Sequence, residues 1–199
     1  MYIIGAGTLG EIVLETAMLA GLTVHGFYDD VTEAAQYDGI PILGRLDDFR
    51  NDKSAMARGA FIAIGDNLKR QACADSFRAL GVHLHNIIDP RAMLSSSASL
   101  GEGNLLLAGA YVGTKCSLGS CNLIFPGVSI THHNEIGSFC FFSPNASVGG
   151  FTKFGDCCKV GMNCVVLPYQ EITSGFECSP LTVLEGRKLA SHNGVSGTT

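Results

Sequence analysis

Residues 100–124 read LGEGNLLLAGAYVGTKCSLGSCNLI, and a large aliphatic side chain returns in this stretch at every sixth position. The period runs from residue 88 to residue 177, which makes 15 hexads. The large residues of the hexads are Ile88, Leu94, Leu100, Leu106, Val112, Leu118, Ile124, Ile130, Ile136, Phe142, Val148, Phe154, Val160, Val166 and Ile172. A fixed period of six residues is typical of the parallel β-helix. We expect five triangular coils of 18 residues, stacked about 4.8 Å apart.

The residues two positions before the large ones are mostly small, so each short strand should point one large and one small side chain inward. Residues 18 apart should stack, which predicts an amide ladder from Asn104 to Asn122. Glycines that follow the large residues, such as Gly137, should relieve the backbone where each strand ends.

Half of the eight cysteines occupy the small inward position. These four are Cys116, Cys140, Cys158 and Cys164. Buried thiols behave as small apolar side chains, so we expect packing residues and no catalytic thiol.

Residues 1–87 alternate between predicted strands and helices, which indicates a small parallel sheet. We expect strands at 2–5, 23–28 and 60–64, helices at 10–20 and 67–80, and a last extended segment at 82–85. Residues 5–10, GAGTLG, match a dinucleotide fingerprint, and Asp29 and Asp30 follow about 20 residues later. The short domain leaves no second half for a nicotinamide cofactor. A phosphate cradle at the helix N-terminus, or a tight turn without a ligand, are the remaining interpretations.

Composition restricts the class of partner. The 199 residues carry 13 Lys plus Arg and a formal charge of −5, which argues against a nucleic-acid partner. The sequence shows neither an apolar run of membrane-spanning length nor a basic leader, so a cytoplasmic protein with a small substrate is expected.

Several motifs occur together with the hexads: IGAG at residues 4–7, YDD at 28–30, AIGDN at 63–67 with Arg70, and IDPRA at 88–92. From residue 2 to residue 177 the chain resembles the bacterial sialic acid O-acetyltransferase and nucleotide-amino-sugar N-acetyltransferase family. The resemblance implies a Rossmann-like α/β domain over 1–87, a left-handed parallel β-helix over 88–183 and a tail over 184–199. It also implies homotrimers with active sites between adjacent helices, and a role in bacterial glycan biosynthesis.

The same resemblance assigns roles to residues. Substrate-binding positions would be Gly7, Thr8, Gly10, Asp29, Asp30, Gly65 and Asn67. Acetyl-CoA, the co-substrate, would contact Phe141, Gly150, Met162 and Pro168. The family's catalytic His falls five residues before a hexad glycine, which is His132 before Gly137. Gly150, 18 residues later, could offer its backbone N–H to the oxyanion, while His132 acts as the base. No metal is expected.

Some positions depart from the family pattern. The family usually has an acid directly after the catalytic His, where this chain has His133. Leu9 stands where many relatives have His in the glycine turn, and Phe141 where many have a second His. The segment 178–199 lacks the Gly-x-Pro-Ala-Lys motif that often ends such helices.

Two other classes of function remain open beside the sugar acetyltransferase. One is a non-catalytic or regulatory β-helix protein, since fold does not guarantee activity. The other is a zinc enzyme like the γ-type carbonic anhydrases, which needs three histidines, whereas the hexads contain only His132 and His133. We also expect the outward residues Leu105, Leu123 and Phe141 to be covered by homotrimer formation.

Overall fold

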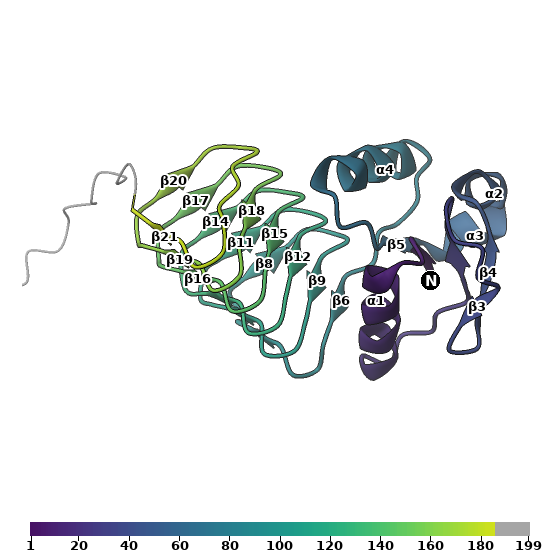
Figure 1. The fold of residues 1–199 in the computed structure, drawn as a ribbon, viewed down its shortest axis with the longest axis horizontal. Coiled ribbons are helices and arrows are strands. Elements are labelled where there is room, and N and C mark those ends of the chain that lie inside the picture. Colours follow the sequence, from purple (N-terminus) through teal and green to yellow (C-terminus); the bar gives the residue numbers. More distant parts are fainter. Residues whose placement is uncertain (186–199) are drawn as a thin grey trace, which may run out of the picture.

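The chain folds into an N-terminal α/β domain and a β-helix in the computed structural model, which describes residues 1–185 (Figure 1). The N-terminal domain contains a five-stranded sheet in the order β3-β4-β2-β1-β5. Its strands are β1 (Tyr2–Ile4), β2 (Phe27–Tyr28), β3 (Gln36–Tyr37), β4 (Ile40–Gly44) and β5 (Ala60–Ile62). Its helices are α1 (Thr8–Leu19), α2 (Leu46–Asn51), α3 (Lys53–Arg58) and α4 (Asn67–Ala79). All strand pairs are parallel except β3 with β4.

The predicted strands and helices of this domain are present, although β2 is shorter than expected. The segment 82–85 contributes only a bridge between Leu84 and Ala60. The elements between residues 36 and 58 were not predicted, because they are two to six residues long and show no apolar period. None of the helices within residues 1–185 is long and apolar enough to cross a membrane.

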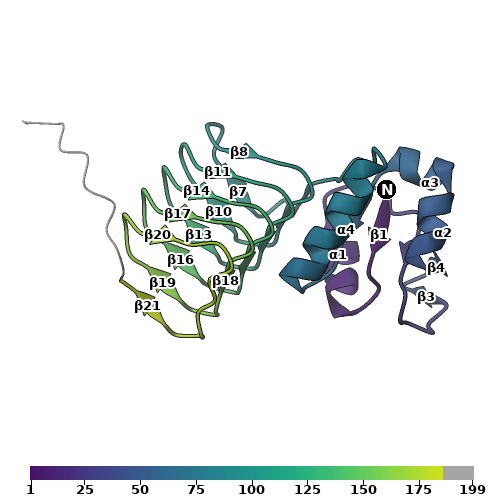
Figure 2. The ribbon, with the colours of Figure 1, turned by 90° about the horizontal axis from the view of Figure 1, so that it is seen from above.

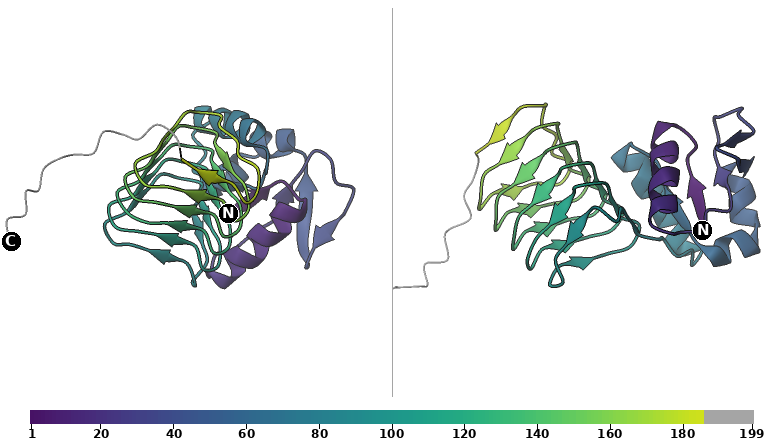
Figure 3. Two further views of the ribbon diagram at one scale, coloured as in Figure 1. Left: turned by 60° about the vertical axis from the view of Figure 1, so that its left-hand side comes forward. Right: turned by 90° about the horizontal axis from the view of Figure 1, so that it is seen from below.

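The β-helix has three faces of parallel, two-residue strands. Face 1 consists of β6 (Ile87–Ile88), β9 (Leu105–Leu106), β12 (Leu123–Ile124), β15 (Phe141–Phe142) and β18 (Lys159–Val160). Face 2 consists of β7 (Met93–Leu94), β10 (Tyr111–Val112), β13 (Ser129–Ile130), β16 (Ser147–Val148), β19 (Val165–Val166) and β21 (Val183–Leu184). Face 3 consists of β8 (Ser99–Leu100), β11 (Ser117–Leu118), β14 (Glu135–Ile136), β17 (Lys153–Phe154) and β20 (Glu171–Ile172). Figure 3 (left) shows the coils stacked one behind another.

Paired strands are 18 residues apart throughout, for example Ile124 with Phe142, so the predicted register is confirmed. The interior holds most of the predicted large and small residues, including all four inward cysteines, whereas the predicted large residue Leu94 is exposed. The Asn ladder differs from the expected one. The side-chain oxygen of Asn104 accepts from the backbone N–H of Asn122 (2.9 Å), and that of Asn122 accepts from the N–H of Cys140 (2.8 Å).

From residue 103 onward, each corner of the coil turns through one residue in the left-handed region. These residues recur every six positions: Gly103, Gly109, Lys115, Cys121, Gly127, His133, Phe139, Asn145, Phe151, Cys157, Asn163, Tyr169, Gly175 and Leu181. The glycines that follow the large residues were expected to relieve backbone constraint at the strand ends. That reason was wrong, since Gly137 does not have positive φ. A Cβ there would lie 2.8 Å from the carbonyl oxygen of Gly155, so close coil stacking requires the glycine.

The N-terminal domain covers face 1 of the β-helix. Figure 2 shows α1 and α4 between the β-helix and the strands β3 and β4. Leu105 and Leu123 are fully buried in one cluster with Val13 and Leu14 of α1. The expectation that a trimer covers these leucines was therefore wrong, because the same chain covers them. Fully burying a leucine side chain stabilises a fold by about 1.5–3 kcal/mol, so the burial of Leu105 and Leu123 against α1 helps to hold the two domains together.

Candidate active site

His132 lies between β13 and β14, at the corner where face 2 turns into face 3. We call the column of residues 114, 132, 150 and 168, with the left-handed residues that follow them, the open corner. The Phe151 N–H donates to the carbonyl of His132 (3.1 Å), which stacks Gly150 on His132. A Cβ on Gly150 would lie only 2.3 Å from Cε1 of the exposed His132 ring. The predicted stacking is confirmed, and their catalytic roles stay predictions.

The backbone N–H of Gly150 is free among residues 1–185, where it donates to no acceptor. The corresponding amides are bonded at the corner between faces 3 and 1, which we call the docked corner. There the N–H of Ser120 donates to Ser138 Oγ (3.0 Å) and that of Ser138 to Asp156 Oδ1 (2.7 Å). The equivalent acceptor for Gly150 would come from residue 168, which is proline. The Gly150 N–H is therefore available to a ligand.

Aromatic rings surround the imidazole of His132. Its Nδ1 lies 3.3 Å from Nδ1 of His133, with the two rings nearly perpendicular at 84°. The His133 ring stacks on Phe151 at 4.7 Å between centroids, and Phe151 stacks on Tyr169 at 5.1 Å. Phe151 also presents a T-shaped contact to His132 at 5.4 Å. The 18-residue spacing predicts Phe151 one coil above His133, and the structure confirms it, but sequence reasoning missed Tyr169 as the next ring of the column.

The glycine turn in the N-terminal domain is shaped for close approach. Gly7 is the N-cap of α1 and has no side-chain cap, and a Cβ there would meet nothing within 4 Å. A Cβ on Gly10 would lie 2.3 Å from the carbonyl oxygen of Gly5, so Gly10 permits the helix to pack on the strand. Exposed Gly7 and Thr8 at the positive end of α1 can therefore face an anion, as predicted for a phosphate cradle.

Asp29 and Asp30 are both engaged with the backbone. Asp29 Oδ2 accepts from the N–H of Ala6 (2.8 Å), and Oδ1 accepts from those of Val31 and Thr32 (both 2.7 Å). Burial acts to raise the pKa of Asp29, but these three bonds outweigh it and hold that pKa below its usual value. Asp30 Oδ1 accepts from the N–H of Leu46 (3.0 Å). Asp29 thus fixes the glycine turn, and ligand contacts by either carboxylate stay predictions.

Asn67 and Arg70 join α4 to the docked corner. Asn67 Nδ2 donates to the carbonyls of Cys157 (3.0 Å) and Cys158 (3.2 Å). The buried Arg70 donates to the carbonyls of Cys121 (2.9 Å) and Phe139 (2.8 Å), and to Asn67 Oδ1. Burial lowers the pKa of Arg70 to about 10, so the guanidinium is still charged at neutral pH. Sequence reasoning placed Asn67 among substrate contacts and did not find this clamp.

A hollow of about 180 Å³ lies beside the clamp and is lined by Gly65, Asn67 and Lys159 among others. It joins the two domains at the N-terminus of α4. Gly65 is exposed there and free to contact a ligand, whereas the Asn67 amide is already committed to carbonyls.

The residues predicted to contact acetyl-CoA are not gathered at one place in a single chain. Pro168 stacks next to Gly150 at the open corner. Phe141 projects from face 1 and stacks on Phe125 at 4.7 Å. Met162 is exposed at the third corner, between faces 1 and 2. Face 2 separates Phe141 and Met162 from the open corner.

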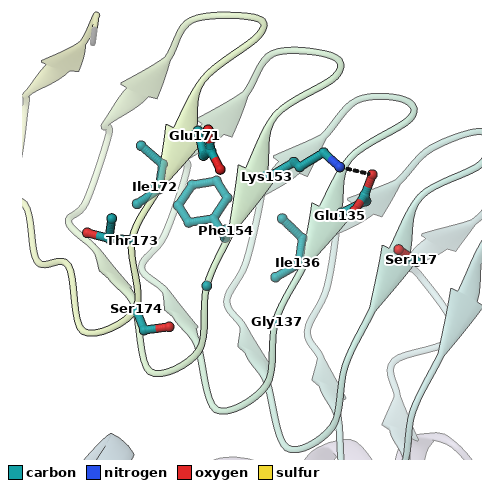
Figure 4. A pocket seen from close by; sticks show the side chains of 11 residues that line it. Ser117, Glu135, Ile136, Gly137, Lys153, Phe154, Glu171, Ile172, Thr173 and Ser174 are labelled. Carbon is teal, nitrogen blue, oxygen red and sulfur yellow. Dashed lines mark ion pairs between the residues drawn. The ribbon is translucent and has the colours of Figure 1, made fainter. Parts of the chain in front are cut away.

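A larger hollow of about 570 Å³ lies on face 3 (Figure 4). Its outward side chains Glu135, Lys153 and Glu171 stack in successive coils. Lys153 Nζ forms an ion pair with Glu135 Oε1 at 2.7 Å. Because this lysine is already neutralised, the hollow does not present a free cation to the phosphates of a coenzyme.

Among the described residues, the structure brings together no set of metal ligands, and it buries the Cys140 thiol. Within residues 1–185, no group of three His, Cys, Asp or Glu is placed to hold a metal ion. Hydrogen bonding to Cys158 and burial raise the pKa of Cys140 far above the usual thiol value. This thiol therefore stays neutral, in agreement with a packing role.

Comparisons with known proteins match both domains. Residues 1–77 match the model of the PglD N-terminal domain. The acetyltransferase domain of PglB from Neisseria gonorrhoeae FA1090 superposes with a TM-score of 0.86 at 24% identity, over 95% of this chain and 92% of that one. Its complex with acetyl coenzyme A gives 0.82 at 25% identity, over 92% and 91%. A mutant GDP-perosamine N-acetyltransferase from Caulobacter crescentus, with CoA and GDP-perosamine, gives 0.75 at 25%, over 89% and 92%. No curated protein matches the sequence.

The order of the domains defines the class of protein, which is an α/β domain of the PglD type followed by a left-handed parallel β-helix. Within that class, the chain is similar to hexapeptide-repeat sugar acetyltransferases, and the solved structures that it resembles include complexes with acetyl coenzyme A and with CoA.

Proposed function

We propose that this protein transfers the acetyl group of acetyl-CoA to an amino group, or a hydroxyl, of a nucleotide-linked or free sugar in bacterial glycan biosynthesis. The observation that carries the proposal is the exposed His132 resting on Gly150, whose N–H is free among the described residues. A base and an oxyanion donor are the two groups that acyl transfer requires.

The chemistry follows from these two groups. His132 Nε2 takes a proton from the acceptor amine as its nitrogen attacks the thioester carbonyl. The N–H of Gly150 stabilises the oxyanion that forms on the carbonyl oxygen. The C–S bond then breaks, the amide product remains, and the CoA thiolate leaves and is protonated by the His132 imidazolium.

The geometry supports a site shared between two chains. The N-terminal domain covers face 1 of its own β-helix, while His132 lies at the opposite corner, between faces 2 and 3. A neighbouring chain could bring its own glycine turn to this corner. We therefore propose a homotrimer with active sites between chains, in the cytoplasm.

Release of CoA thiol in the presence of acetyl-CoA and a panel of GDP- and UDP-linked amino sugars tests the function. General-base catalysis contributes about 10²–10⁴-fold, so His132→Ala should lower kcat by that factor with little change in acetyl-CoA binding. A folded wild type that acetylates no sugar of the panel would favour the regulatory alternative. Full activity of His132→Ala would remove His132 from the mechanism.

Complementation tests the shared site. Gly7→Asp should fold, because Gly7 has open space and Asp is a favourable N-cap, but its charge should repel a phosphate. Mixing refolded Gly7→Asp and His132→Ala chains should restore turnover, since some sites would combine two intact halves. If mixed oligomers of Gly7→Asp and His132→Ala chains stay inactive, the whole site lies within one chain.

A further inference from the structure

The imidazoles of His132 and His133 share one hydrogen bond. Their Nδ1 atoms are 3.3 Å apart, which leaves room for one proton between them. One ring must donate through Nδ1–H and the other must accept through an Nδ1 lone pair. The direction of this bond decides which nitrogen of His132 can act as a base.

We propose that His133 is a positioning residue that accepts from Nδ1–H of His132 and so keeps Nε2 of His132 unprotonated. The inference rests on the proposed function. A neutral imidazole has one N–H, and a base needs a lone pair directed at the acceptor group. With its proton held on Nδ1, His132 presents the lone pair on Nε2. His133 must then carry its own proton on Nε2.

The fold holds His133 firmly enough for this task. Its φ is 53°, a left-handed conformation in which His is several-fold enriched relative to most residues. Its N–H donates to the carbonyl of Thr114 (2.9 Å), which fixes the backbone. Its ring stacks nearly parallel to Phe151, at 19°, and Phe151 stacks on Tyr169. The stack fixes the plane of the His133 ring, and the hydrogen bond to His132 favours the orientation of that ring in which Nδ1 faces His132.

The proton balance differs from that of a His with a carboxylate partner. When His132 takes the acceptor's proton on Nε2, the pair carries one positive charge and His133 remains the acceptor. A proton on His133 Nδ1 would remove the acceptor and turn His132 to the other tautomer. Lys115 lies in the same corner one coil earlier, and Glu135 with its partner Lys153 lies on the adjoining face 3.

Nitrogen-15 NMR of the imidazoles tests the bond direction without needing turnover. In wild-type protein at about pH 8.5, well above the usual His pKa, we expect His132 protonated on Nδ1 and His133 on Nε2. His133→Gly removes the acceptor without backbone strain, and there His132 should become a mixture of tautomers. Wild-type His132 protonated on Nε2, or a tautomer unchanged in His133→Gly, would overturn the proposal.

Rescue by a second variant separates positioning from general support. Asn also tolerates positive φ, and its side-chain oxygen can accept from His132. Wrong-tautomer losses elsewhere reach about 10⁴-fold, so we expect His133→Gly to lower kcat by roughly 10–100-fold and His133→Asn to recover most of it.

Equal losses of kcat in His133→Gly and His133→Asn would overturn the positioning role. If the wild type turns over no sugar, the proposed function fails, while the NMR result still decides the direction of the bond.

Discussion

The docked corner and the open corner have the same backbone but opposite uses. Both turn through residues of positive φ, such as Phe139 in one and Phe151 in the other. At the docked corner Phe139 is buried against the N-terminal domain, and the corner amides are bonded to Ser and Asp side chains. At the open corner Phe151 is 40% exposed, and Gly150 keeps a free N–H among the described residues.

This difference shows that the backbone of the coil does not determine the use of a corner. The side chain 18 residues later decides whether a corner amide is sealed or available. What covers the left-handed residue then decides whether the corner binds a domain or remains accessible. We expect the largest effect of a substitution on stability at the docked corner, where the charged residue Arg70 is fully buried.

Replacing Arg70 should have the largest effect on stability. Arg70→Met leaves the carbonyls of Cys121 and Phe139 buried without their donor, and such groups cost about 1–3 kcal/mol each. We expect the free energy of unfolding in urea to fall by about 3 kcal/mol or more. The free energy of unfolding of Arg70→Lys should lie between those of the wild type and Arg70→Met, because an ammonium group cannot make all the hydrogen bonds of a guanidinium group.

The matched control is Arg58→Met, the same substitution at an exposed position. It should leave the unfolding midpoint near that of the wild type. If Arg70→Met is no less stable than Arg58→Met, the docked corner does not depend on the clamp.

At the open corner, Gly150→Ala should reduce activity more than stability. The added Cβ would lie 2.3 Å from Cε1 and 2.7 Å from Nδ1 of His132, so the imidazole must move. Misplacement of a catalytic group by about 1 Å costs roughly 10²-fold, and we expect kcat to fall by about that factor. Ser147→Ala, on face 2 one coil away from the His132 strand, is the control and should keep full turnover. An unchanged kcat in Gly150→Ala would separate the imidazole position from catalysis.

Much of the β-helix could be predicted because its determinants are local and periodic. The hexad spacing predicted the three faces and the stacking of Asn104, Asn122, His132 and Gly150 correctly. The pattern of large and small residues also predicted the burial of the inward cysteines.

What could not be predicted depends on contacts between distant segments. No periodic signal shows that α1 covers Leu105 and Leu123, so their outward position was assigned to a trimer contact. Arg70 and Asn67 occur in a motif, but their partners on the β-helix are backbone carbonyls 51 to 91 residues away. Carbonyls carry no sequence identity, and only the folded chain reveals such acceptors.

The smallest and most specific test converts the open corner into a sealed one. In Pro168→Ser, the new hydroxyl would stand one coil above Gly150, as Ser138 stands above Ser120, whose N–H it accepts at 3.0 Å. We expect this introduced hydroxyl to bind the Gly150 N–H and compete with the oxyanion. Complete loss of one oxyanion donor costs about 10²–10³-fold in kcat, and a competing serine should cost less, about 10-fold.

Stability and a matched corner decide whether Pro168→Ser acts in this way. The new bond should keep the unfolding midpoint close to that of the wild type. Pro144→Ser makes the same change at the third corner, where the residue one coil below is Pro126 and has no N–H to donate. Turnover and stability should therefore be unaffected by Pro144→Ser.

If Pro168→Ser is folded and fully active, the free amide of Gly150 is not the oxyanion donor. If both serine variants lose activity equally, the effect comes from losing a corner proline, and the distinction between sealed and open corners does not explain catalysis.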